Sequence, residues 1–315
     1  MADLYLHSRL SEEVLKKLDY DFDMGLVFLG SQGPDPLYYN VSKKDGKDYR
    51  YHADRMHDTN TQMLFKNMVM HVKSNTTKET YSHMIGFICH YALDVKIHPY
   101  VYYNAGVYKK DDPSTHKYRG LHLKFERSID AVKILEEQMM KPNKFKIHKT
   151  YFTVQDVPID VMNVMGHVLK QTYGKDHGGL MYKIGTKKMY GNIKNIVHDR
   201  WGLKNLLLKF IDLFSKGDMF YEDISFANHI EEYDYLNNKK ATWHHPVTNE
   251  EHNESVDELF EQARVFALDM IKNVNSYIFD DKNIDLDKVF TNLSFNSGLN
   301  CDLHEKMTHF KMYRK

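Results

Sequence analysis

Two histidine–carboxylate pairs stand at helical spacing in the first half of the sequence. His90 and Asp94 are four residues apart, and His122 and Glu126 repeat that interval. Residues four apart lie on one face of a helix, so each pair can direct an imidazole nitrogen and a carboxylate oxygen to one point. Zinc takes both of these groups as ligands in proteins. The spacing favours a metal site, although a single pair of this kind also occurs on ordinary helix surfaces.

A third histidine lies between the two pairs. His98 directly precedes Pro99, and proline disfavours helical structure in the residue before it. We therefore expect the helix that bears His90 to end near residue 97, with His98 at its mouth. Two pairs that flank a third histidine, within strongly apolar helices, indicate a metal cluster more strongly than one pair does.

Composition sets bounds on the class of protein. Lys plus Arg equals Asp plus Glu at 43 each in 315 residues, so no net positive charge favours binding to nucleic acid or to an anionic membrane. Nineteen histidines and two cysteines suggest metal ligation by nitrogen and oxygen in a reducing compartment. We expect a cytoplasmic protein, because we find no secretory leader, no long apolar run and no segment typical of an interfacial anchor.

Helical periodicity recurs along most of the chain. There is no internal repeat and no linker rich in Pro, Gly or Ser. The sequence therefore predicts an all-α protein, with a single large multi-helical domain over residues 1–280 and a tail, residues 281–315, packed on the same domain. We expect helices over residues 10–18, 57–71, 78–97, 119–140, 157–174, 201–217 and 255–279.

Three further residues upstream are candidate ligands. His7 lies at or just before the start of the first expected helix. Asp35 follows a short apolar run, in the segment GSQGPDPLYY, where glycines and prolines indicate a loop with a stiff backbone. His57 is the third, and His52 is an alternative to it. We favour His57 because we expect it to open a helix.

Other residues have a more ordinary interpretation. His83 lies two turns before His90 on the same face, and we expect both it and His116 to be satisfied core or surface histidines. Cys89 is expected to be a small buried side chain rather than a ligand. The segment Trp243-His244-His245 is expected to form a packed loop.

The candidate residues occur in a recognisable order. That order resembles the zinc-dependent phospholipase C family of bacteria, and within it an intracellular-type member from Gram-positive bacteria. The similarity covers most of the chain, and it implies an all-helical domain that holds two or three zinc ions. The residues that carry it are His7, Asp35, His57, His90, Asp94, His98, His122 and Glu126.

The resemblance also implies how the ligands are shared. It assigns one zinc to Asp35, His57, His90 and Asp94, and a second zinc to His98, His122 and Glu126. Asp94 resembles a carboxylate that bridges to a third zinc, also held by His7, and Asp35 resembles the general base. Secreted members complete the third site with an N-terminal Trp, whereas this sequence begins Met1-Ala2-Asp3. They also have a longer interval between the counterparts of Asp94 and His98.

The expected activity is hydrolysis of a phosphodiester by metal-activated water, on a phospholipid or a smaller soluble phosphodiester. Two alternatives stay open. One is a three-zinc single-strand nuclease, which the zero net charge and Glu126, at a position where those nucleases have Asp, both disfavour. The other is a metal-stabilised interaction protein without catalytic activity. The head group, the oligomeric state and binding of iron or manganese at one site are left open.

Overall fold

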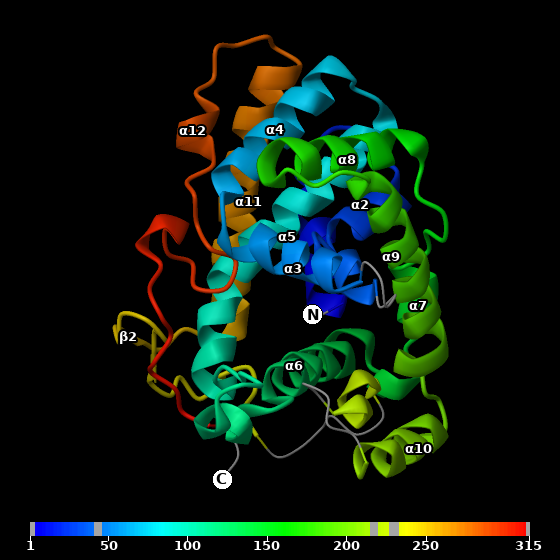
Figure 1. Ribbon diagram of the computed structural model, residues 1–315, viewed down its shortest axis with the longest axis vertical. Coiled ribbons are helices and arrows are strands. Elements are labelled where there is room, and N and C mark those ends of the chain that lie inside the picture. The colour runs from blue at the N-terminus through cyan, green and yellow to red at the C-terminus, as the bar shows by residue number, and fades with distance from the viewer. Residues whose placement is uncertain (1–3, 41–45, 215–219, 227–232, 313–315) are drawn as a thin grey trace.

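Helices dominate the protein (Figure 1). The computed structural model describes residues 4–40, 46–214, 220–226 and 233–312, so Met1-Ala2-Asp3 lies outside the described residues. The α-helices are α1 Leu4–Leu15, α2 Met24–Gly30, α3 Gly46–Asp58, α4 Thr61–Ser74, α5 Lys78–Ala105, α6 Leu121–Gln138, α7 Ile147–Thr150, α8 Ile159–Tyr173, α9 Gly178–Asn192, α10 Leu203–Asp212, α11 Val256–Ile278 and α12 Leu286–Val289.

Short elements connect these helices. A two-stranded antiparallel sheet pairs β1 with β2. Each strand is only two residues long, and the other regular elements of the described residues are helical, so the all-α prediction is confirmed. The strands are β1 Trp243–His244 and β2 Glu251–His252, and the short helical turns are η1 Asp35–Tyr39, η2 Pro113–Tyr118, η3 Pro142–Lys144, η4 Ile193–Val197, η5 Tyr221–Ile224 and η7 Cys301–Leu303.

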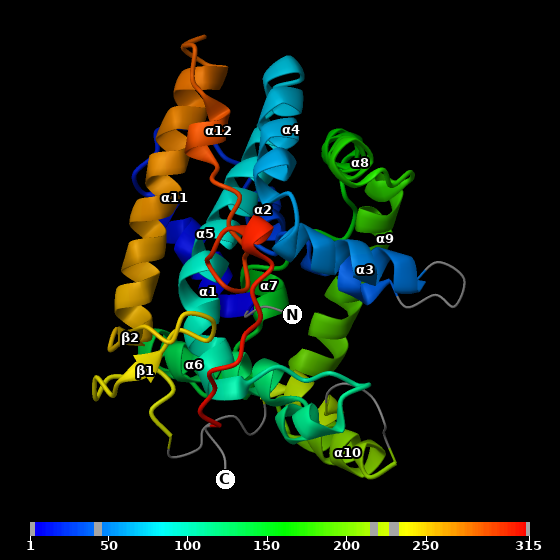
Figure 2. The same cartoon turned by 60° about the vertical axis from the view of Figure 1, so that its left-hand side comes forward.

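Helix α5 is the axis of the fold. It begins at a capping box, in which the backbone N–H groups of Thr77 and Thr80 each donate to the other residue's side chain. Nearly all of its residues are buried, as expected of a helix that is apolar on every side. Helix α11 runs beside it along much of its length (Figures 1 and 2), and α2 packs against it as extensively.

Helix α5 continues through Pro99, so the expectation that it ends before this proline was wrong. Proline removes a backbone donor and leaves the carbonyl of Val95 without its usual helical partner. Gly298 lies against that carbonyl, where a Cβ would come 2.7 Å from the oxygen. The tail can thus cover the interrupted turn only because Gly298 has no side chain. His98 stands on an unbroken helix, one turn after Asp94.

Helices α2 and α5 cross with their backbones in contact. A Cβ on Gly86 would lie 2.0 Å from the carbonyl oxygen of Val27, and one on Gly30 would lie 2.1 Å from that of His83. Two glycines therefore allow this close crossing. The crossing brings the loop after α2, with Asp35, next to the turn of α5 that bears His90.

Other helix boundaries differ from those expected. The first helix begins at Leu4 rather than near residue 10, and the expected helix over residues 57–71 is two helices, α3 and α4. His57 consequently lies in the last turn of α3 and does not open a helix. Helix α9 was not expected, because its four glycines and three lysines obscure the apolar pattern.

The tail packs along α3, α4 and α5. Phe295 donates its backbone N–H to the carbonyl of His57 at 2.8 Å. Its ring is fully buried, with ring centroids 6.3 Å from Phe65 and 4.8 Å from Tyr91. These contacts agree with a tail that belongs to the main body, while the boundary at residue 280 stays a prediction.

Candidate metal centre

Five elements converge on one buried cluster. All eight candidate ligands of the sequence analysis lie in it, joined in a continuous series of short contacts between imidazole nitrogens and carboxylate oxygens. They are His7 on α1, Asp35 at the start of η1, His57 on α3, His90, Asp94 and His98 on α5, and His122 and Glu126 on α6.

Asp94 is the centre of the cluster. Its Oδ1 lies 3.2 Å from His7 Nε2 and 3.3 Å from His98 Nε2. Its Oδ2 lies 3.0 Å from His90 Nε2 and 3.9 Å from His57 Nε2. Each carboxylate oxygen therefore faces a different pair of imidazoles, which is the arrangement a bridging ligand needs.

The cluster extends from Asp94 in two directions. On one side, His57 Nε2 lies 3.4 Å from Asp35 Oδ1. On the other, Glu126 Oε1 lies 3.1 Å from both His98 Nε2 and His122 Nε2. Three groups of ligand atoms lie close enough to surround an ion: His7, His90 and Asp94; Asp35, His57 and His90; and His98, His122 and Glu126.

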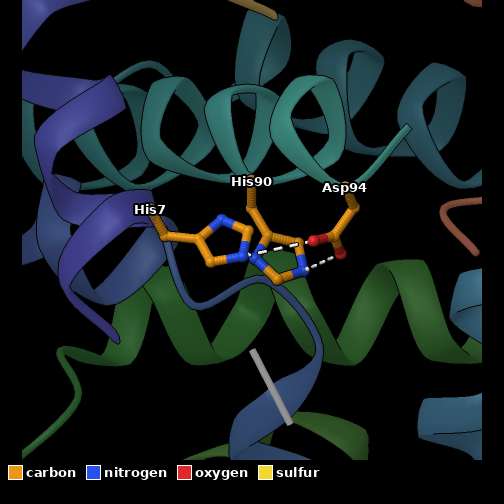
Figure 3. A group of neighbouring side chains, drawn as sticks. All are labelled: His7, His90 and Asp94. Carbon is orange, nitrogen blue, oxygen red and sulfur yellow. Dashed lines mark ion pairs between the residues drawn. The ribbon is translucent and has the colours of Figure 1, made fainter. Parts of the chain in front are cut away.

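Figure 3 shows the first of these groups. His90 and Asp94 project from the same face of α5, one turn apart, and His7 reaches them from α1. The rings of His7 and His90 are stacked, with centroids 4.4 Å apart and planes at 22°. Stacking fixes both rings, so their Nε2 atoms stay directed toward the carboxylate of Asp94.

Backbone carbonyls orient three of the imidazoles. The Nδ1 atoms of His57, His90 and His98 lie 2.8, 3.1 and 3.0 Å from the carbonyl oxygens of Ala53, Ser31 and Phe295. A carbonyl can only accept, so each Nδ1 donates its proton, and in the neutral imidazole each Nε2 then has a lone pair directed into the cluster. Support of this kind is usual behind metal-binding histidines.

The position of His7 depends on a carboxylate of α6. Asp130 is fully buried, and its Oδ2 and Oδ1 accept from the backbone N–H groups of Tyr5 and Leu6, each at 2.9 Å. Those two donors belong to the first turn of α1, where backbone N–H groups have no partner within the helix. Asp130 thus caps α1 and fixes His7 against α5.

The donor atoms fit zinc. His90 Nε2 and Asp94 Oδ2 are 3.0 Å apart but are not aligned as a hydrogen bond, and among the described residues neither has another hydrogen-bond partner. The second oxygen of Glu126, Oε2, is also buried without a hydrogen bond from the described residues. Unpaired buried acceptors that point to a common place are costly unless a cation satisfies them.

Burial and charge oppose each other at the carboxylates. Burial raises the pKa of Asp94, but the surrounding imidazoles lower it more, so that the pKa lies well below its usual value. The pKa values of Asp35 and Glu126 are lowered in the same way against burial, chiefly by the hydrogen bond from His57 and by the charge of His122. Three buried anions side by side require positive charge, which protons or metal ions can supply.

Two of the imidazoles respond in the opposite sense, whereas burial lowers the pKa values of His7 and His122. Burial lowers the pKa of His98, but the charge of Asp94 and the hydrogen bond and charge of Glu126 raise it to about 9. The pKa of His57 is raised against burial by its contacts with Asp35. A metal ligand must be a neutral imidazole, so metal ions compete with protons for these nitrogens.

The residues that we did not favour as ligands lie elsewhere. His52 points toward the rings of Tyr51 and Tyr173. His83 is fully buried, with Nε2 3.0 Å from the hydroxyl of Tyr182, and His116 is exposed on η2.

Two further predictions concerned the segment Trp243-His244-His245, expected to be a packed loop, and Cys89, expected to be a small buried side chain. Trp243 is buried and stacks on His252 with ring centroids 4.4 Å apart, in the small sheet. His245 accepts hydrogen bonds from the backbone N–H groups of a following turn and lies 2.9 Å from the Ser297 carbonyl. Cys89 and Cys301 are free and buried.

The cluster is most open at His122. This side chain is 25 % exposed, whereas those of the other ligands in the same contacts are at most 7 % exposed. The ring of Tyr102 lies 4.6 Å from the His122 ring, and Tyr102 also lines a cavity of about 470 Å³ whose other walls include Lys109 and Asn296. His122 is therefore the ligand that solvent reaches most easily, and none of the eight ligands lines that cavity itself.

Arg127 is a buried cation that the sequence analysis did not single out. It is 2 % exposed, and its Nε and Nη1 have no hydrogen-bond partner among the described residues. Burial raises the pKa of Tyr39 to about 12, while the charge of Arg127 lowers it and that of Asp35 raises it, so both charges act on this ring. The position directly after Glu126 was the only signal in the sequence, and it does not reveal burial.

The comparison with protein families agrees with this geometry. A family model described as zinc dependent phospholipase C matches residues 6–174, which is more than half of the chain. The chain belongs to the zinc-dependent phospholipase C family. All eight candidate ligands lie inside the matched range, whereas helices α9 to α12 follow it. Neither a curated protein nor a solved structure matched the chain.

Family and geometry together support a zinc-dependent, phosphodiesterase-like hydrolase. The family prediction from the sequence is thus confirmed. Among the described helices, none has both the length and the apolar composition needed to cross a membrane.

Proposed function

We propose that this protein is a zinc metallohydrolase that cleaves phosphodiesters in the manner of a phospholipase C. The observation that carries the proposal is the shared carboxylate of Asp94, whose two oxygens face two sets of imidazoles. Such sharing is suited to ions a few Å apart, as in hydrolases that use more than one metal. When bound, zinc supplies Lewis acidity that favours hydroxide at neutral pH and offsets the charge of a phosphodiester.

The contacts support the ligand sets that the family resemblance implies. Asp35, His57, His90 and Asp94 would hold one ion, and His98, His122 and Glu126 a second, with His7 and Asp94 available to a third. The second set offers three protein ligands. Three-ligand zinc sites keep a position for water or substrate, whereas structural sites are closed by four. This favours a catalytic role over an interaction protein that uses zinc only for stability.

Asp35 is the proposed general base. Its pKa is held low despite burial, chiefly by the hydrogen bond from His57, so it is ionised and can accept a proton. It stands at the end of the cluster, on a turn between Pro34 and Pro36 that restricts its backbone. A carboxylate in this position can orient a water molecule and hold its proton during attack on phosphorus.

The proposed substrate is a phospholipid or a smaller phosphodiester that enters beside His122. The cavity next to Tyr102 has room for a head group. Arg127 supports an anionic substrate, because a buried guanidinium with unpaired donors is well suited to phosphate. Two free cysteines support a reducing, cytoplasmic setting, and we keep the assignment to intracellular-type members from Gram-positive bacteria as part of the proposal.

Elemental analysis of protein purified without added metal, beside an Asp94→Asn variant, tests the proposal. We expect two or three zinc ions per chain in the native protein and fewer in the variant. Hydrolysis should then be measured on phospholipid and on single-stranded DNA. Cleavage of the lipid alone supports the proposal, and cleavage of DNA alone indicates a nuclease. If a zinc-replete control binds no metal, the enzyme proposal is wrong.

A further inference from the structure

Helix α10 presents its apolar side to solvent. Leu206, Leu207 and Phe210 are each 60 % exposed or more, and so are four neighbours along the chain. Soluble proteins seldom expose so many adjacent large apolar side chains, and where they do the surface usually binds something. We call this surface the α10 stripe, and its members are Trp201, Leu203, Leu206, Leu207, Phe210, Leu213 and Phe214.

The polar residues of α10 fasten it to the protein. Asn205 is the buried residue of the helix, and its Nδ2 donates to the carbonyl of Glu222 at 2.9 Å. Asp212 accepts from the backbone N–H groups of Tyr221 and Glu222, each at 2.8 Å. An ordinary surface helix buries its apolar face, so these bonds hold α10 in the reverse orientation.

Positive charge lies at the start of the stripe. Residues 194–214 contain four basic residues and two aspartates, and one of the basic residues, Lys209, is paired with Glu222 at 3.5 Å. Both aspartates are used internally, Asp199 by the N–H of Asn205 and Asp212 by η5. Arg200 and Lys204 are exposed at the start of the helix, and the Arg200 guanidinium lies 5.2 Å from the Trp201 ring.

The neighbouring segment adds to this charge. Residues 141–150 contain four lysines and no acidic residue. Asn143 Nδ2 donates to the carbonyl of Arg200, so this segment adjoins the start of the stripe. The partly buried imidazole of His198 has a pKa lowered by burial and, to a smaller extent, by the charges of Lys204 and Lys146, which is consistent with the two lysines lying on the same side.

These observations select one kind of partner. A helix with Trp, Leu and Phe on one side and basic residues beside them binds in the interface of a lipid bilayer, with the apolar side among the acyl chains and the cations near anionic head groups. We propose that the α10 stripe docks this protein on the surface of an anionic phospholipid bilayer. This goes beyond the proposed function, because binding requires no hydrolysis. It also departs from the sequence analysis, which found no interfacial anchor because periodicity does not show which side of a helix is exposed.

The stripe is linked to the open side of the metal centre. Phe220 directly precedes η5, the turn to which Asp212 of α10 is hydrogen-bonded. The Phe220 ring packs against Gly120, where an added Cβ would come within 2.8 Å of the ring. His122 is two residues further along α6. Both views place α10 at an outer edge of the molecule, next to the elements around α6 (Figures 1 and 2). Docking through the stripe would therefore hold the end of α6 that bears His122 near the lipid.

Vesicle binding by the full chain tests the proposal. The probes are phosphatidylcholine vesicles with and without phosphatidylglycerol, and binding is followed by co-sedimentation. We expect binding to the anionic vesicles, weakened by added salt. The double variant Leu207→Glu/Phe210→Glu should lower the partition coefficient by about tenfold or more, because it places carboxylates where the lipid must be. Its activity on a soluble phosphodiester should be unchanged.

A matched control carries the same substitutions elsewhere. Val265 on α11 is 56 % exposed and Ile159 on α8 is 64 % exposed, so Val265→Glu/Ile159→Glu should leave vesicle binding unchanged. Fluorescence gives a second readout, because Trp201 is exposed and Trp243, the other of the two tryptophans, is buried. A blue shift on addition of anionic vesicles, lost in Trp201→Phe, would place the stripe in the lipid.

Two results would overturn the proposal. One is equal binding of the native chain and the Leu207→Glu/Phe210→Glu variant. The other is no vesicle binding together with a concentration-dependent dimer, abolished by that variant in light scattering, which would make a second copy of this chain the partner. If the chain binds vesicles but no zinc, this proposal stands and the proposed enzyme function fails.

Discussion

Helices α5 and α10 depart from ordinary burial in opposite ways, because α5 buries charged residues and α10 exposes apolar ones. Helix α5 is buried on all sides and carries three polar residues of the metal centre on one inner face. Helix α10 buries an asparagine and exposes leucines and phenylalanines. Burying charge and exposing apolar surface both cost stability. The two exceptions to ordinary burial thus mark the two places where we expect the protein to meet other molecules.

The largest expected effect is the loss of turnover in Asp35→Asn, which distinguishes the role of general base from that of metal ligand. Asp35→Asn keeps the size of the side chain but removes its ability to accept a proton. Turnover on a phosphodiester should fall by about 10²–10⁴-fold, the usual contribution of a general base. Most of the zinc should remain, because the other ligands are intact. Steady-state kinetics and elemental analysis measure the two quantities on the same preparation.

The control for this variant is Asp54→Asn. Asp54 is exposed on α3 and accepts a hydrogen bond from the Tyr38 hydroxyl, outside the cluster. It should retain both zinc and turnover. If Asp35→Asn loses zinc in proportion to activity, Asp35 acts as a ligand alone and another group must be the base.

The second expected effect tests the contrast between the helices directly. Ile88 on α5 is fully buried, and Ile88→Ala should lower the free energy of unfolding by about 2–5 kcal/mol, through lost burial and the cavity left behind. Leu207→Ala on α10 should change it by no more than about 0.5 kcal/mol, because this side chain is already in water. Urea denaturation of both variants, with zinc present throughout, measures the difference. A large loss for Leu207→Ala would mean that the α10 stripe is covered in the folded protein.

The sequence alone predicted the parts of the metal centre that depend on the spacing of residues within one helix. The four-residue intervals from His90 to Asp94 and from His122 to Glu126 are visible without a structure, and each pair does converge. The order of the other candidates came from the family resemblance, since nothing local reveals that Asp35 and His57 meet. Their meeting depends on the crossing of α2 and α5 and on the tail at Phe295, both of which are long-range contacts.

Two rules based on local sequence gave a wrong or an incomplete prediction. The rule that proline ends a helix failed at Pro99, because proline removes only one backbone donor and the helix continues after it, with Gly298 of the distant tail packed against the freed carbonyl. The apolar period of residues 201–217 correctly indicated a helix. It could not indicate which face points inward, because periodicity is the same in either orientation. Only the hydrogen bonds of Asn205 and Asp212 reveal that the apolar side of α10 is outside.

The smallest expected effect concerns His83, a polar residue that α5 buries away from the metal centre. Burial lowers its pKa from 6.5 to about 3, so the folded protein holds the imidazole neutral. The unfolded chain takes up a proton below about pH 6.5 and the folded chain does not, so stability from this residue is lost as the pH falls from about 6.5 toward 3. At pH 5.5 the loss relative to pH 7.5 should be about 1.4 kcal/mol. His83→Gln should abolish that part of the pH dependence in urea denaturation, whereas Tyr182→Phe, which removes the hydrogen-bond partner and keeps the imidazole, should retain it. An unchanged pH dependence in His83→Gln would show that the imidazole becomes protonated in the folded state, and that α5 tolerates a buried charge outside the cluster.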